Sequence, residues 1–200
     1  MKVYLVSNNS MLDKINYENI DLELVRLLRP LSIEGELFAK NISDLKELES
    51  VEKIYTSIYT SAVCSAKYLS SKLDLKINMN MDFNDCLVGN LGAMSMKRLK
   101  EMQEHDFNYK IQEGESLNEV GNRLDKAIKK VINNEEKICI FTHKRAILGY
   151  LLKYTSVGYN LDDKLILEYN ETLVYGGADN DYDVHELTFN DNELVDIKCI

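Results

Sequence analysis

The 200-residue chain has little of what marks a membrane or secreted protein. It contains one proline and no tryptophan, and no apolar run approaches the ~20 residues that cross a bilayer. The apolar stretch at the N-terminus turns polar at Ser7, which makes it too short for a secretory signal. These absences predict a cytoplasmic protein with no membrane partner.

Clustered cations and paired cysteines are also scarce. The chain has 24 basic and 33 acidic residues, a net charge of -9, whereas nucleic-acid affinity depends on clustered Lys and Arg. The densest basic spots, at 97–100 and 144–145, are typical of solvated helix ends. The four cysteines lack metal-ligand spacing, which predicts reduced thiols. We therefore expect no nucleic-acid partner, no metal and no cofactor.

What the chain does contain is a regular alternation of buried strands and amphipathic helices. Continuous apolar runs are typical of parallel strands that are covered on both faces. No linker or internal repeat interrupts the alternation, so we predict one domain spanning residues 1–200. Strands are expected at 3–6, 51–56, 137–142, 171–175, 183–189 and 194–198, with a turn-rich segment at 176–181.

The helices are predicted from apolar residues that recur every three or four positions. The clearest one begins at Ser116, which stands three residues before Glu119 as a capping box requires. Together with the strands, the helices predict an α/β fold, a three-layer α/β/α sandwich around a mostly parallel central sheet. Helices are expected at 32–49, 59–73, 95–104, 116–132 and 146–151.

Polar residues follow three of the predicted strands. In open parallel sheets, ligands bind outside the carboxyl ends of the strands. The first strand leads to Asn8, the second to Ser61 at the start of its helix, and the late strand at 137–142 to His143. If these three strands are neighbours, the three side chains lie at one rim of the sheet.

Taken in order, these motifs resemble the histidine phosphatase superfamily, which includes the cofactor-dependent phosphoglycerate mutases. The resemblance covers roughly residues 3 to 155 and implies a phosphoglycerate mutase-like fold. It also implies phosphoryl transfer through a phosphohistidine. The segments that carry it are the first strand with its polar triplet 7–9, 29–35, 54–57 with Ala62 and Ala66, 113–116 with Arg123, and 138–143.

Carried over position by position, the resemblance also shows departures at the catalytic positions. Asn8 stands where the family has its nucleophilic histidine, and Asn9 where it has a glycine. His143 matches the second histidine, and Asp85 is the counterpart of the family acid. The family catalytic positions are thus Asn8, His143 and Asp85. The implied ligand-binding positions are Ser7 and Ser61, which replace arginines, with Asn8, Asn9, His143 and Lys144, which replaces a glycine.

Three functions remain open. The leading one is a pseudoenzyme, which binds a small anionic or polar ligand or a protein partner, because an amide nitrogen does not accept a phosphoryl group. Each lost charged donor would cost a further ~3 kcal/mol of transition-state stabilisation. The alternative is a phosphatase or other hydrolase of altered chemistry, acting on a phosphorylated metabolite through His143 and Asp85. The third is an assembly protein with a vestigial pocket, and a homodimer is the default oligomer.

Overall fold

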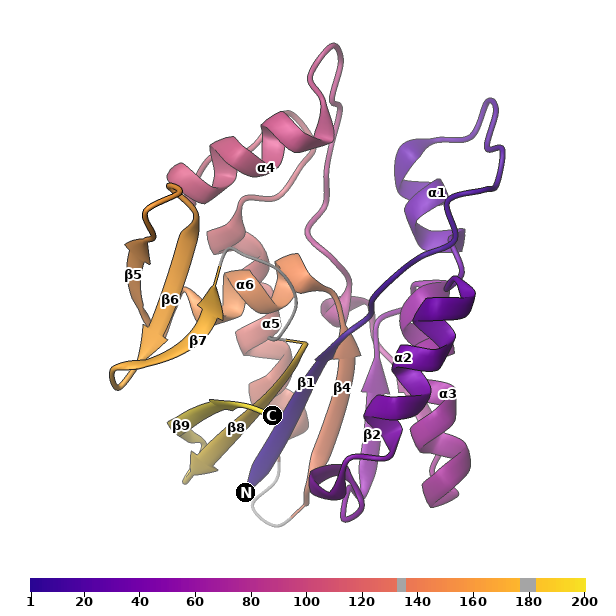
Figure 1. The fold of residues 1–200 in the computed structure, drawn as a ribbon, viewed down its shortest axis with the longest axis vertical. Coiled ribbons are helices and arrows are strands. Elements are labelled where there is room, and N and C mark those ends of the chain that lie inside the picture. Colours follow the sequence, from indigo (N-terminus) through magenta and orange to yellow (C-terminus); the bar gives the residue numbers. More distant parts are fainter. Residues whose placement is uncertain (133–135, 177–182) are drawn as a thin grey trace.

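The computed structural model describes residues 1–132, 136–176 and 183–200. A central sheet of six strands has the order β3-β2-β4-β1-β8-β9 (Figure 1). The first four pair in parallel, whereas β8 and β9 are added antiparallel at one side. The strands are β1 (Lys2–Ser7), β2 (Lys53–Thr56), β3 (Ile77–Met79), β4 (Ile138–Thr142), β8 (Val184–Asn190) and β9 (Glu193–Cys199).

Helices cover both faces of this sheet, which confirms the predicted α/β architecture (Figure 1). Alternate residues of β1 enter two separate cores: Val3 packs with α5 (Leu117–Val131) and α6 (Lys144–Leu151), and Tyr4 packs with α3 (Thr60–Leu73). A strand that is buried on both sides reads as a continuous apolar run, as the sequence showed. A further helix, α2 (Ile33–Ser43), packs against α3.

Several elements are shorter than predicted or were not predicted. The helix expected at 32–49 ends at Ser43, and a 3-10 turn, η1 (Lys46–Leu48), follows it. The exposed strand β3 was not predicted, because a mostly exposed strand lacks an apolar pattern. The predicted turn at 176–181 lies outside the described residues, apart from residue 176. The other elements that the sequence did not show are α1 (Leu22–Leu28), η2 (Met81–Phe83), β5 (Ser156–Tyr159) and β6 (Leu165–Tyr169).

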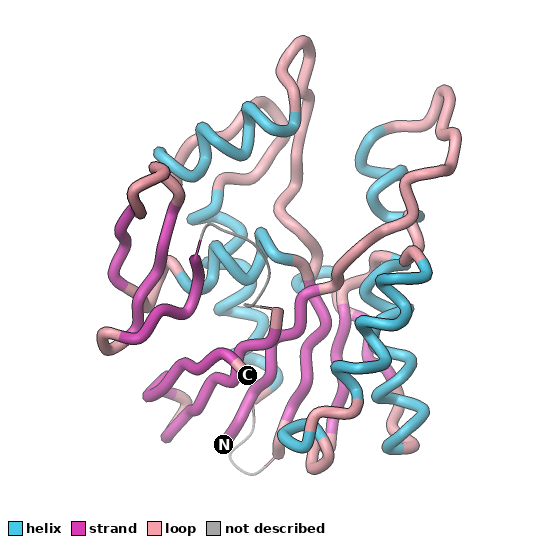
Figure 2. Tube along the Cα trace, viewed as in Figure 1, coloured by secondary structure: helices cyan, strands magenta, loops and turns pink. Residues whose placement is uncertain are grey.

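Long connections project from the carboxyl edge of the parallel strands (Figure 2). Residues 8–21 lead from β1 to α1, and residues 84–95 lead from η2 to α4 (Met96–His105). The strands β5, β6 and β7 (Thr172–Gly176) form a small antiparallel sheet that is separate from the central sheet. In the described part of the chain, no helix has the length and apolar character needed to span a membrane.

Helices α5 and α6 pack against each other through two glycines. A Cβ atom added at Gly121 would lie 2.0 Å from the carbonyl oxygen of Gly149, and one added at Gly149 would lie 2.5 Å from that of Leu117. The two backbones therefore approach more closely than any side chain allows. The α5 helix itself begins with the predicted capping box between Ser116 and Glu119.

We expect Gly121→Ala to destabilise the protein by roughly 1–3 kcal/mol, because α6 must shift to accommodate the methyl group. Urea unfolding measures the change. Lys126→Ala, at an exposed position of the same helix, is the matched control and should stay within ~0.5 kcal/mol of the parent protein. Equal stability of the two variants would show that the helices do not pack as described.

Candidate functional site

The parallel strands bring Asn8 and Ser61 together at the carboxyl edge of the sheet. The backbone N–H of Asn8 donates to the carbonyl of Thr142 at 3.1 Å, which ties the end of β1 to the end of β4. The Asn8 side-chain amide then donates to Ser61 Oγ at 2.7 Å, and both residues are buried. Asn8 thus donates hydrogen bonds to both β4 and α3, which are far apart in the sequence and fix its position.

His143 occupies the N-cap position of α6, directly after β4. A hydrogen bond of 2.8 Å joins its Nε2 to Ser57 Oγ, and the ring of Tyr59 lies 4.8 Å away, centroid to centroid. Burial lowers the pKa of His143 to about 4, and the negative charge of Asp85 opposes this shift only in part. The imidazole is therefore neutral at pH 7.

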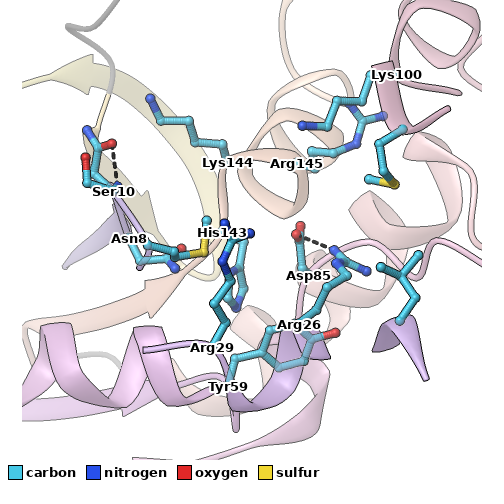
Figure 3. A pocket seen from close by; sticks show the side chains of 14 residues that line it. Asn8, Ser10, Arg26, Arg29, Tyr59, Asp85, Lys100, His143, Lys144 and Arg145 are labelled. Atoms are coloured by element: carbon cyan, nitrogen blue, oxygen red, sulfur yellow. Dashed lines mark hydrogen bonds and ion pairs between the residues drawn. The ribbon is translucent and has the colours of Figure 1, made fainter. Parts of the chain in front are cut away.

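Asp85 lies on the connection between η2 and α4 and faces the same space as His143 (Figure 3). Arg26 of α1 donates to its Oδ2 at 2.6 Å, and the backbone N–H of Cys86 donates to Oδ1 at 2.9 Å. Burial opposes ionisation of this carboxyl, but the neighbouring His143 and Arg26 hold its pKa below the usual value. Asp85 is therefore an ionised carboxylate that is bound to a guanidinium.

Ser7 points away from these residues. Its hydroxyl donates to Asp183 Oδ1 at 2.7 Å, and the same carboxylate pairs with Lys144 Nζ at 3.1 Å. The Asn9 side chain lies 3.4 Å from Asp183 Oδ2. The position where the resemblance implies an arginine thus contacts a buried carboxylate instead.

A cavity of about 460 Å³ opens at this edge of the sheet. Five of its lining side chains are basic and one, Asp85, is acidic, although the whole chain has a net charge of -9. Five of the predicted site residues line it: Asn8, Asn9, Asp85, His143 and Lys144. Ser61 lies behind Asn8, and Ser7 is not part of the lining. The other lining residues are Ser10, Met11, Leu22, Arg26, Arg29, Tyr59, Met96, Lys100 and Arg145.

The basic lining corrects one expectation from the sequence. The departure is Arg145, since Lys97 and Arg98 are solvated as predicted, with side chains 88% and 64% exposed, and Lys100, which also lines the cavity, is exposed as well. Arg145 is only 12% exposed, and it donates to the side chain of Gln103 at 2.5 Å. No sequence signal distinguishes Lys100 from its neighbours, although it lies one helical turn after Met96, which also lines the cavity.

Arg26 and Tyr59 were also missed as site residues. Arg26 comes from α1, which has no sequence pattern that predicts it, and its guanidinium carbon lies 5.9 Å from the centre of the Tyr59 ring. Figure 3 shows Lys100 and Arg145 at one end of the cavity and Asn8 at the other. Arg145 adds to the effect of burial in lowering the pKa of Lys100. Lys100 has no ion-pair partner within the described ranges.

Residues 29–188 match the histidine phosphatase superfamily (branch 1). The chain belongs to this superfamily. The matched range begins after the triplet 7–9 and includes Ser61, Asp85 and His143. No curated protein matches the sequence.

Solved structures with a similar fold come from several bacteria. A mycobacterial glucosyl-3-phosphoglycerate phosphatase, Rv2419c, solved with inorganic phosphate, superimposes with a TM-score of 0.69 at 14% identity, covering 100% of this chain and 95% of its own. Bacillus stearothermophilus YhfR gives 0.63 at 18% identity, with 97% and 94% covered. TTHB049 from Thermus thermophilus gives 0.60 at 19%, with 98% of each chain covered. At these identities the likeness shows the phosphoglycerate mutase-like fold.

The buried histidine makes stability depend on pH. An unfolded histidine titrates near pH ~6.5, but the pKa of His143 is about 4, so between these values the unfolded chain binds more protons. The free energy of unfolding should therefore fall as the pH drops from 6.5 towards 4, by up to ~3 kcal/mol for this group. Buried His185, also with a pKa of about 4, acts in the same direction.

Urea unfolding at pH 7 and at pH 4.5 tests this origin of the acid sensitivity. His143→Asn should show a smaller loss of stability between the two pH values than the parent protein. An unchanged loss would mean that His143 is already accessible to protons in the folded protein.

Proposed function

We propose that this protein binds a small phosphate-bearing anion in the cavity between Asn8 and Lys100, and that it does not form a phosphohistidine. The observation that carries the proposal is the make-up of the lining, in which five side chains are basic and one is acidic although the whole chain is acidic. Clustered cations around a concave space favour anions, since each charge-assisted hydrogen bond contributes roughly 1.5–3 kcal/mol.

Lys100 and Arg145 provide the clearest anion-binding element. The two cations lie close enough for Arg145 to contribute to lowering the pKa of the Lys100 ammonium. A phosphate monoester carries between one and two negative charges at neutral pH, and placed between the two cations it would offset their repulsion. The structural neighbour Rv2419c was solved with inorganic phosphate, which supports the same class of ligand.

The absence of a phosphohistidine is inferred from the residues at the edge of the sheet. Asn8 offers an amide, whose nitrogen donates to Ser61, and this nitrogen does not attack phosphorus because its lone pair is delocalised into the carbonyl group. Among the described residues, His143 is the only histidine that lines the cavity, and its Nε2 is already hydrogen-bonded to Ser57. We infer that His143 contributes a neutral polar contact to the ligand.

Binding is tested with inorganic phosphate and isothermal titration calorimetry. We expect Lys100→Gln to weaken phosphate binding by about tenfold or more, because one charge-assisted contact is lost. Lys97→Gln is the matched control: it removes the same charge from the same helix at an 88% exposed position. Equal affinities of the two variants would place the phosphate elsewhere.

Catalysis is tested by restoring the family residues. The parent protein should not hydrolyse generic phosphomonoesters at a measurable rate, and the combined variant S7R/N8H/N9G/S61R should gain turnover if only those groups are missing. Robust turnover by the parent protein that disappears in His143→Ala would contradict the proposal.

A second candidate is a hydrolase of altered chemistry that uses Asp85 and His143. Its support is that the chain belongs to a phosphatase superfamily and that Rv2419c is a phosphatase. In the structure Asp85 is ionised and His143 is neutral, which suits two proton acceptors better than a proton donor. A substrate screen that finds turnover sensitive to Asp85→Asn would favour this candidate over the first.

A further inference from the structure

The segment from Ser10 to Ser32 leaves the central sheet and returns to it beside its own starting point. The N–H of Leu12 donates to the carbonyl of Pro30 at 2.9 Å, and the N–H of Ser32 donates to that of Ser10 at 2.9 Å. Between these contacts the segment carries α1, in which none of the seven residues is buried. In Figure 1 this segment stands above α2 and α3 at the carboxyl edge of the sheet.

Polar contacts, rather than apolar burial, attach α1 to the loop that carries Asp85. The Arg26 guanidinium donates to Asp85 Oδ2 at 2.6 Å and to the Cys86 carbonyl at 3.1 Å. Its helix neighbour Glu23 accepts from the N–H of Val88 at 2.6 Å and pairs with Arg26 at 2.9 Å. Arg26 also lines the cavity, so the residue that fastens α1 faces the ligand space.

We propose that Arg26 is a ligand-binding residue that exchanges its contact with Asp85 for a contact with the ligand's phosphate group. In the structure Asp85 accepts the hydrogen bond from the Arg26 guanidinium that the phosphate would accept after the exchange. The exchange supplies an arginine from α1 to a site whose strand-end positions, Ser7 and Ser61, carry none. This inference rests on the proposed function, because it needs an anion in the cavity.

A phosphate oxygen can replace the carboxylate oxygen because Arg26 binds Asp85 through a single oxygen, Oδ2, and a phosphate oxygen accepts the same charge-assisted hydrogen bond. Asp85 would not be left as an isolated buried charge. Arg145 is a nearby cation, the charge of Asp85 favours the charged form of Lys100, and the Cys86 N–H donates to Oδ1 at 2.9 Å. Glu23 would remain on α1 as a second partner of Arg26.

A double-mutant cycle with inorganic phosphate as the probe separates this exchange from a structural role. Arg26→Gln should weaken phosphate binding by about tenfold, whereas Asp85→Asn should tighten it, because the competing carboxylate is gone. In the double variant the gain from Asp85→Asn should disappear. If the ion pair only held the fold together, both single variants would weaken binding. If Asp85→Asn still tightens phosphate binding when Arg26 is absent, the gain reflects a general change of charge, and the proposal is overturned.

Further variants separate charge from geometry. Arg26→Lys retains the charge but not the paired donors, and it should recover part of the affinity that Arg26→Gln loses. Arg98→Gln, on the exposed face of α4, should bind phosphate as the parent protein does. Hydrogen exchange of the α1 amides gives a readout without ligand: it should be faster in both Arg26→Gln and Asp85→Asn, and unchanged exchange would contradict the role of this ion pair in fastening α1.

The failure of this inference can be distinguished from the failure of the proposed function. If the parent protein binds phosphate and Lys100→Gln weakens binding but Arg26→Gln does not, then only the exchange is wrong. If the parent protein binds no phosphate, then the proposed function and the exchange are both wrong.

Discussion

The parallel pairing of β1, β4 and β2 is the constraint on which the site depends. Parallel strands end at the same edge of the sheet, so Asn8, Ser57 and His143, which are distant in sequence, all lie at that edge. The hydrogen bond from Asn8 N–H to the Thr142 carbonyl and that from Ser57 N–H to the Phe141 carbonyl, at 3.1 and 3.0 Å, continue this pairing beyond the last strand residues. Asn8 and His143 therefore have little freedom to separate, whatever surrounds them.

The edge of the sheet alone would make a polar site of low charge. Its residues are amides, hydroxyls and a neutral imidazole, held in place by one another. The positive charge comes from the surrounding layer of α1, α4 and α6, which contribute Arg26, Lys100 and Arg145. The charges therefore lie around the cavity, and the proposed binding function depends on this division.

Asp85 links the two layers. It lies beside His143, and it is also the partner of Arg26. Two donors hold its half-buried carboxylate, the Arg26 guanidinium at Oδ2 and the Cys86 N–H at Oδ1. The position that the resemblance assigns to the family acid thus serves, in this protein, to hold the guanidinium of α1 next to the cavity.

The sequence by itself determined the α/β fold, most strand and helix positions, and the rim where Asn8, Ser61 and His143 lie, because these follow from local apolar patterns and from where buried strands end. The resemblance also predicts which residues stand at the family's catalytic positions. Only the tertiary structure decided which cations face the cavity. Lys97 and Lys100 look alike in sequence, and Arg26 lies on a helix in which no residue is buried. Whether such side chains meet solvent or a shared cavity depends on contacts between α1, α4 and α6, which no local pattern contains.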